Sequence, residues 1–259
     1  MSPVTASLLA VVVALSASGA QETTTVAQSG HVKVPFGVGE QLIYDVKFGA
    51  LKVGSGAMEV LGTEVIRGRE TWHTVFRVKG GTFFYRVDSN WESWIDTKNL
   101  HSLRYVADEE MGGRDRRRVY NFFPDLAMYV EDGKPQEPSV KEPLDDGSFI
   151  YFVRTVPLAV GETYEFNRYF KPDRNPVVIK VLRKETIQVP AGRFDAIVIQ
   201  PIIKSKGIFS EKGKAEIWLA DDSTRMVLQM KSQLSFGSLN LYLKSYRPAP
   251  GSSAATSGR

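Results

Sequence analysis

Two pairs of residues combine an acid with a tryptophan at the same spacing. Glu92 stands two residues before Trp94, and Glu216 stands two residues before Trp218. Residues two apart in a β-strand lie on one face of the sheet, so each pair presents a carboxylate beside an indole. Because Trp joins a large apolar surface to one hydrogen-bond donor, such a pair on a concave face is suited to a lipid or a sugar. The alternative is structural: both tryptophans pack at a sheet edge or between sheets.

Carboxylates are the remaining candidates for catalysis. Glu92 and Asp96 share a strand face, as the two acids of a glycosidase would. Such pairs are also commonplace on solvated faces. A hydrolase that uses Glu92 or Glu216 is therefore the weakest of three functional hypotheses, and we expect no catalytic residues.

Metal and cofactor chemistry has no support in the residue pattern. The histidines are His31, His73 and His101, and none has a second ligand-type residue at a metal-binding spacing. The chain also lacks the serine-nucleophile elbow and the Gly-rich phosphate loop. We therefore expect structural histidines, no metal site and no cofactor.

The sequence around the two acid–tryptophan pairs contains a repeated pattern. Val-Gly-Glu occurs at Gly39 and again at Gly161, and an aromatic residue follows five positions later, Tyr44 and Phe166 respectively. The acid–tryptophan pairs come later in each copy. Internal self-similarity of this kind predicts a duplicated structural unit.

The hydrophobic pattern predicts strands. Leu42, Tyr44 and Val46 alternate with polar residues, which is the period of a half-buried strand. We predict an all-β fold: antiparallel sheets in a curved sandwich or an open barrel, built from similar halves at 36–123 and 158–247.

The joint between the halves, 124–157, contains one predicted short helix. Potential N-caps precede an apolar run at 149–156, and Pro157 ends it. This helix is placed to plug or cap the sheet.

The N-terminus predicts export. An apolar run at 8–15 leads to small residues at Ser18 and Ala20, which fits a signal peptide at 1–20 cleaved after Ala20. The first seven residues contain no Lys or Arg, and the alternative is a buried N-terminal strand. We further predict a flexible lead-in at 21–35, a single β-rich domain at 36–247 and a disordered tail at 248–259.

Composition restricts the chemistry and the kinds of binding partner that are expected. Cysteine is absent, so disulfides and thiolate chemistry are excluded. The 33 basic and 29 acidic residues are interspersed, which does not indicate a nucleic-acid-binding field. The run Arg116-Arg117-Arg118 follows Gly112-Gly113 and faces acids before it, so a solvated hairpin is favoured over a nucleic-acid patch. No further apolar stretch is long enough for a transmembrane helix, and the mature chain is expected to be soluble or peripheral.

A family resemblance covers nearly the whole mature chain. The motifs are Gly39-Glu40 with Tyr44, the apolar segment before Arg154, the turn 189–194 and the Trp218–Asp221 segment. They resemble the exported bacterial domain-of-unknown-function family 3108. The resemblance implies an envelope location and a β-rich fold, and it implies no activity and no functional residues.

Two functional hypotheses lead. The first is a non-catalytic periplasmic or envelope protein that holds an apolar or amphipathic, lipid-like ligand, with Glu92, Trp94, Glu216 and Trp218 as the candidate binding residues. The second is a structural or interaction module of a cell-envelope assembly that binds a protein partner through a sheet edge.

Overall fold

A computed structural model describes residues 34–82, 85–204, 215–234 and 237–250. The described residues form fourteen strands, one α-helix and two short 3-10 helices, Pro124–Leu126 and Pro172–Arg174. The first eight strands are β1 Gln41–Phe48, β2 Leu51–Ile66, β3 Arg69–Thr82, β4 Tyr85–Asp96, β5 Ser102–Met111, β6 Arg114–Phe123, β7 Met128–Glu131 and β8 Glu137–Pro138. After helix α1, Asp146–Val153, come β9 Thr163–Phe166, β10 Val177–Val189, β11 Gly192–Ile202, β12 Glu216–Ala220, β13 Val227–Leu234 and β14 Gly237–Arg247.

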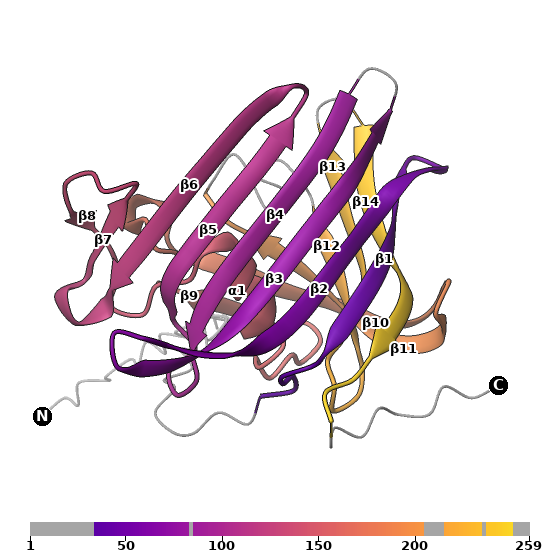
Figure 1. Cartoon of the computed structure of the whole chain (residues 1–259). Coiled ribbons are helices and arrows are strands. Elements are labelled where there is room, and N and C mark those ends of the chain that lie inside the picture. Colours follow the sequence, from indigo (N-terminus) through magenta and orange to yellow (C-terminus); the bar gives the residue numbers. More distant parts are fainter. Residues whose placement is uncertain (1–33, 83–84, 205–214, 235–236, 251–259) are drawn as a thin grey trace, which may run out of the picture.

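All fourteen strands belong to one open antiparallel sheet. Its order is β8-β7-β6-β5-β4-β3-β2-β1-β14-β13-β12-β11-β10-β9. The first and last of the described strands, β1 and β14, therefore meet in the middle, and the sheet ends on β8 and β9. We call β1–β8 the first wing and β9–β14 the second wing. Figure 1 shows the sheet curling so that β9–β13 lie behind the first wing. The predicted all-β fold is confirmed, in its open-barrel form.

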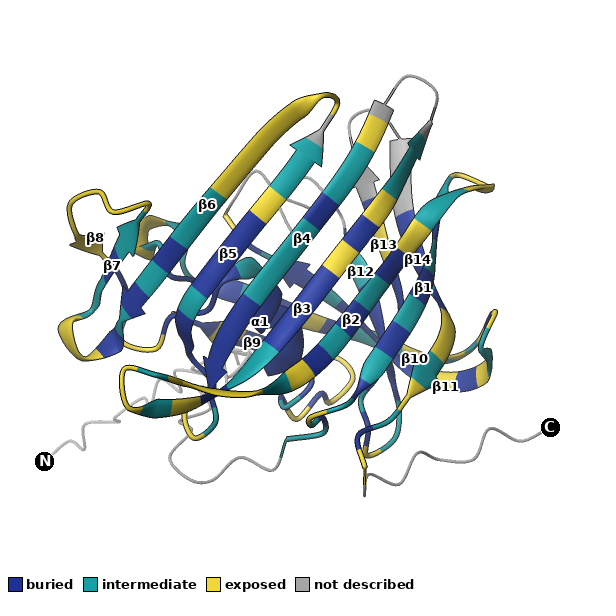
Figure 2. Cartoon of the chain, viewed as in Figure 1, coloured by how far each residue is buried: buried dark blue, intermediate teal, exposed yellow. Residues whose placement is uncertain are grey.

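Alternating side chains build the core between the two wings. In β1, Leu42, Tyr44 and Val46 are buried, whereas the residues between them are only partly covered. The same alternation gives the striped burial of the front strands in Figure 2. Because one face of each strand turns toward the inside of the curve, the hydrophobic effect closes the sheet around a single core.

Helix α1 packs on the inside of this curve, against β3 and β4 (Figure 1). It begins at Asp146, three residues earlier than predicted, because Asp145 and Ser148 form a reciprocal capping box. Gly147 permits the close approach, since a Cβ there would lie 2.6 Å from Ser93 Oγ. The prediction of one short helix at the joint is confirmed, but the helix ends at Val153, three residues before the predicted end at 156.

The Val-Gly-Glu motif has the same backbone role in both halves. Gly39 N donates to Val60 O and Gly161 N donates to Val181 O, each at 2.9 Å. Both glycines have positive φ, +88° and +89°, which favours glycine over other residues. A β-bulge follows Val60 in β2 and Val181 in β10.

The predicted hairpin of β5 and β6 is confirmed. Glycines at 112 and 113 form the turn, with φ of +58° and +77°. The predicted signal peptide, most of the lead-in and residues 251–259 of the tail lie outside the described residues. Among the described helices, none is long and apolar enough to cross a membrane.

Candidate ligand-binding face

The first acid–tryptophan pair lies on the outer face of the sheet. Ser93 Oγ donates to Asp145 Oδ1 at 2.7 Å, so Ser93 points toward α1. Because successive strand residues alternate, Glu92 and Trp94 point away from the helix. We call the helix-bearing side the inner face and the opposite side the outer face.

Glu92 belongs to a charged network on this outer face. Its carboxylate contacts His73 Nε2 at 2.9 Å and accepts from Asn90 Nδ2 at 2.8 Å. The other His73 nitrogen contacts Glu64 at 2.9 Å. Partial burial acts to raise the pKa of Glu92, but the hydrogen bonds from His73 and Asn90 outweigh it and the pKa is lowered. Glu92 is thus held ionised among partners.

Trp94 is buried within the same network. Its Nε1 donates to Glu64 Oε2 at 2.8 Å, and its ring stacks on His73 with centroids 4.3 Å apart. The Arg104 guanidinium covers the ring at 5.0 Å. These contacts cover the indole with side chains of the chain itself.

The second pair has a similar environment. Trp218 Nε1 donates to Glu185 Oε1 at 2.6 Å, and Glu216 accepts from Arg183 at 3.1 Å. Lys231 lies 5.0 Å from the Trp218 ring centroid. Hydrogen bonds from Trp218 and Arg183 lower the pKa of Glu185. Five strands separate β4 from β12 in the sheet, so the fold does not bring the two pairs together.

The described histidines have structural surroundings. His73 is held between Glu64 and Glu92, as above. His101 is buried, and burial lowers its pKa to about 4. His31 lies outside the described residues. Within the described part of the chain, no group of three or more His, Asp or Glu side chains is arranged to hold a metal ion.

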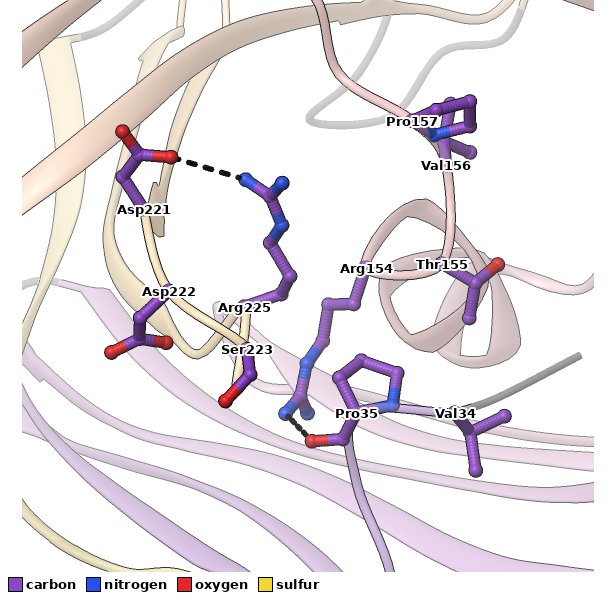
Figure 3. A pocket seen from close by; sticks show the side chains of 10 residues that line it. All are labelled: Val34, Pro35, Arg154, Thr155, Val156, Pro157, Asp221, Asp222, Ser223 and Arg225. Atoms are coloured by element: carbon purple, nitrogen blue, oxygen red, sulfur yellow. Dashed lines mark hydrogen bonds and ion pairs between the residues drawn. The ribbon is translucent and has the colours of Figure 1, made fainter. Parts of the chain in front are cut away.

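A pocket of about 470 Å³ opens where the helix ends (Figure 3). Asp221, Asp222 and Arg225 of the β12–β13 turn face Val34 and Pro35 across it. Asp221 pairs with Lys184 at 2.7 Å and lies 3.7 Å from Arg225. Asp222 accepts a hydrogen bond from the Thr224 backbone at 2.8 Å.

Arg154, which lines this pocket, forms a buried ion pair with Glu40. The Arg154 side chain is fully buried and donates to both Glu40 oxygens, at 2.6 and 2.8 Å. It also donates to the carbonyls of Thr224 and Pro35, at 2.9 and 3.2 Å. Burial acts to lower the pKa of Arg154, but Glu40 outweighs it and the pKa is raised. Arg154 thus ties the helix to the start of β1 and to the second wing.

The other end of the helix carries two adjacent acids on the inner face. Asp145 Oδ1 accepts from Ser93 Oγ and from the amides of Gly147 and Ser148, at 2.7–2.8 Å. Asp146 accepts from the Tyr169 hydroxyl at 3.2 Å. Burial and the charge of Asp145 raise the pKa of Asp146 to about 6. Asp146 is therefore poised to change its charge near neutral pH.

Replacing Asp146 with asparagine is expected to stabilise the protein at pH 7 but not at pH 4. The raised pKa means that the folded state binds the Asp146 proton more tightly than the unfolded state, so the stabilisation is complete below the ordinary pKa and is lost as the pH rises through about 6. Because Asp146 is partly exposed, we expect a gain of about 1–2 kcal/mol at pH 7. Urea unfolding at both pH values measures it. The exposed Asp125→Asn variant is the control, and an equal gain at pH 4 would contradict the assignment.

The inner face joins an apolar wall to a polar cluster. Phe76 and Trp91 are cross-strand neighbours with ring centroids 5.5 Å apart, and with Val78 and Val87 they form the inner apolar wall. Next to it, Trp91 Nε1 donates to Glu109 at 3.0 Å. Glu109 in turn accepts from Arg118 at 2.7 Å.

We define the inner polar cluster as Glu109, Arg118, Asp146 and Tyr169. Although these side chains lie on the inner face, Arg118 remains 26% exposed and Glu109 15% exposed. Trp91 and Val87 are also only partly buried. The inner face therefore places apolar and charged groups side by side. Strand parity in the sequence separates Trp91 from Trp94, but it does not predict which charged side chains join Trp91.

The fold and this face define a class of protein: an open, strongly curved antiparallel β-sheet with one helix inside. The same fold occurs in the beta-barrel-like protein of the domain-of-unknown-function family DUF1849 from Brucella abortus, with a TM-score of 0.55. That protein is 11% identical, and the alignment covers 83% of this chain and 99% of that one. The chain itself belongs to the family DUF3108, described as a protein of unknown function, whose sequence profile matches residues 43–244.

Two further solved structures are similar at lower TM-scores. One is a protein of Parabacteroides distasonis proposed to be a lipoprotein, with a TM-score of 0.37, 11% identity and coverage of 83% of this chain and 98% of that one. The other is a protein of Bacteroides fragilis proposed to be exported, with a TM-score of 0.31, 12% identity and the same coverage. Comparison with curated proteins finds no match.

Proposed function

We propose that this protein is an exported, non-catalytic binder of an amphipathic, lipid-like ligand. The observation that carries the proposal is the inner face, where the inner apolar wall adjoins the inner polar cluster. Ligand sites in proteins are concave and mostly apolar, with a few polar groups that orient the ligand. Export is supported by the apolar run and small residues that precede residue 21.

A non-catalytic role fits the surroundings of the candidate acids. Glu92 is engaged by His73 and Asn90, and Glu216 by Arg183. A general acid or base needs a pKa near the working pH and access to the substrate. The pKa of Glu92 is instead shifted away from neutrality.

Binding can be tested by replacing one valine of the wall with an uncharged polar residue. Val87→Gln is expected to weaken binding of the neutral fluorescent probe N-phenyl-1-naphthylamine about tenfold, because it places an amide in the apolar part of the face. Val65→Gln is the matched control, since Val65 is 71% exposed. Fluorescence titration measures both.

The proposal fails if the wild-type protein shows no saturable probe binding and if native mass spectrometry of protein purified from its own cells repeatedly finds no bound molecule. It also fails if the two valine variants weaken probe binding equally, because the inner wall would then have no special role.

A second candidate function is a protein-binding module that uses a free sheet edge. β7 pairs with only the last four residues of β6, from Tyr120 to Phe123, so among the described strands none pairs with the earlier part of β6 on that side. An open edge offers backbone groups to a partner strand. Crosslinking from the exposed Arg117 in cells distinguishes the two functions: one recurrent protein adduct favours the module, and lipid adducts favour the binder.

A further inference from the structure

The two faces of the β5–β6 hairpin carry opposite charge. Tyr120 lies in the core and therefore fixes which residues of β6 point inward. By alternation, the basic residues that share its face are Arg114, Arg116 and Arg118. Against them the hairpin places a single inward acid, Glu109. The charged residues on its outer face are three acids, Asp108, Glu110 and Asp115, and two bases, Arg104 and Arg117.

This sorting leaves the two arginines nearest the hairpin turn, Arg114 and Arg116, without an acidic partner on the hairpin. Glu109 is already bound by Arg118 and Trp91. The side chains of Arg114 and Arg116 are exposed and form no hydrogen bond or ion pair within the described part of the chain. The Ser89 hydroxyl and Arg118 Nε, also on this face, have no hydrogen-bond partner there either.

The strand register places these groups beside the inner apolar wall. Arg116 is directly opposite Glu109, Glu109 is opposite Ser89, and Ser89 is opposite Val78. At about 4.8 Å per strand, the row from Arg116 to the wall is about 14 Å wide. One molecule with a charged head and an apolar tail can therefore contact both ends of the row.

We propose that the ligand is an anionic amphiphile whose carboxylate or phosphate head binds Arg116 and Arg114 while its tail lies on the inner apolar wall. The head group supplies the negative charge that the hairpin lacks, and guanidinium groups bind both kinds of anion through paired N–H donors. This inference rests on the proposed function and names the chemical class of its ligand.

The test compares head groups on one alkyl chain. The full protein is titrated calorimetrically, below the micellar concentration, with dodecyl phosphate, dodecanoate, dodecyl maltoside and dodecyltrimethylammonium. We expect at least one anionic probe to bind tenfold or more tighter than the neutral probe, and the cationic probe to bind weakest. The tighter anion identifies whether the site prefers a phosphate or a carboxylate.

Arginine variants on opposite faces of one strand complete the test. Arg116→Gln is expected to weaken binding of the anionic probe about tenfold and to leave dodecyl maltoside unchanged. Arg117→Gln makes the same charge change on the outer face and is expected to leave both unchanged. Equal weakening by the two variants, or no preference for anions, overturns the inference while maltoside binding keeps the proposed function. Absence of binding by every probe overturns both.

Discussion

Arg154→Met is expected to lower the free energy of unfolding by about 3–5 kcal/mol. The substitution leaves the Glu40 carboxylate, which is only 4% exposed, without the two guanidinium bonds that balance its desolvation. It also leaves the carbonyls of Thr224 and Pro35 without their donor. Urea unfolding followed by circular dichroism measures the loss: the urea concentration at the midpoint falls, while the dependence of the unfolding free energy on urea concentration stays the same.

The double variant Arg154→Met with Glu40→Met distinguishes the loss of the ion pair from the cost of leaving one buried charge without a partner. Removing both charges leaves no uncompensated ion, so the double variant is expected to be more stable than Arg154→Met. The control is Arg183→Met on the outer face, where the ion pair with Glu216 is exposed and contributes less than about 1 kcal/mol. If the loss of unfolding free energy in the double variant equals the sum of the losses in the two single variants, the two side chains are not coupled. If Arg154→Met does not fold, Glu40→Gln provides the milder test.

Asp145→Ala is expected to lower the free energy of unfolding by about 3 kcal/mol. One carboxylate oxygen accepts three hydrogen bonds, and the alanine leaves the donors of Ser93, Gly147 and Ser148 buried without a partner. The helix also loses its N-cap, which typically contributes about 0.5–2 kcal/mol. Chemical unfolding gives the total, and faster hydrogen exchange at the Gly147 and Ser148 amides locates the loss.

The Asp145→Asn variant distinguishes the effect of losing the hydrogen-bond acceptor from the effect of losing the negative charge. Burial raises the pKa of Asp145, so the charge itself is unfavourable at this position, and an asparagine oxygen can still accept the three bonds. We therefore expect less than about 1 kcal/mol of destabilisation for Asp145→Asn. Asp125→Ala, at a side chain that is 80% exposed, is expected to have a similarly small effect. Equal losses in the alanine and asparagine variants at Asp145 would rule out the hydrogen-bond explanation.

The local features of the fold could be predicted because they depend on neighbouring residues. Alternation in β1 and the Gly112 and Gly113 turn act over a few positions. The apolar run at 149–156 predicts a helix three residues late at both ends, because α1 runs from Asp146 to Val153. The Asp145–Ser148 capping box, which sets the actual start, was present in the sequence.

The candidate site required information that the sequence does not carry locally. The contacts of Trp94 and Glu92 with His73 depend on the register between β3 and β4. Parity separated Trp91 from Trp94, but only the packing of α1 against Ser93 decides which face is inner. For the same reason, the inward arginines of β6 were predicted only as members of a solvated hairpin.

The meeting of β1 and β14 in the middle of the sheet fixes an order of assembly. Within each wing, most pairings join neighbouring strands through short turns, which close small loops. The seam instead joins opposite ends of the domain: Arg247 Nε donates to Gly39 O across 208 positions. Long loops cost more entropy to close and slow folding, so the wings form first and the seam last. Until β14 has been synthesised and docked, β1 presents an unpaired edge, and during that interval the chain is most open to aggregation.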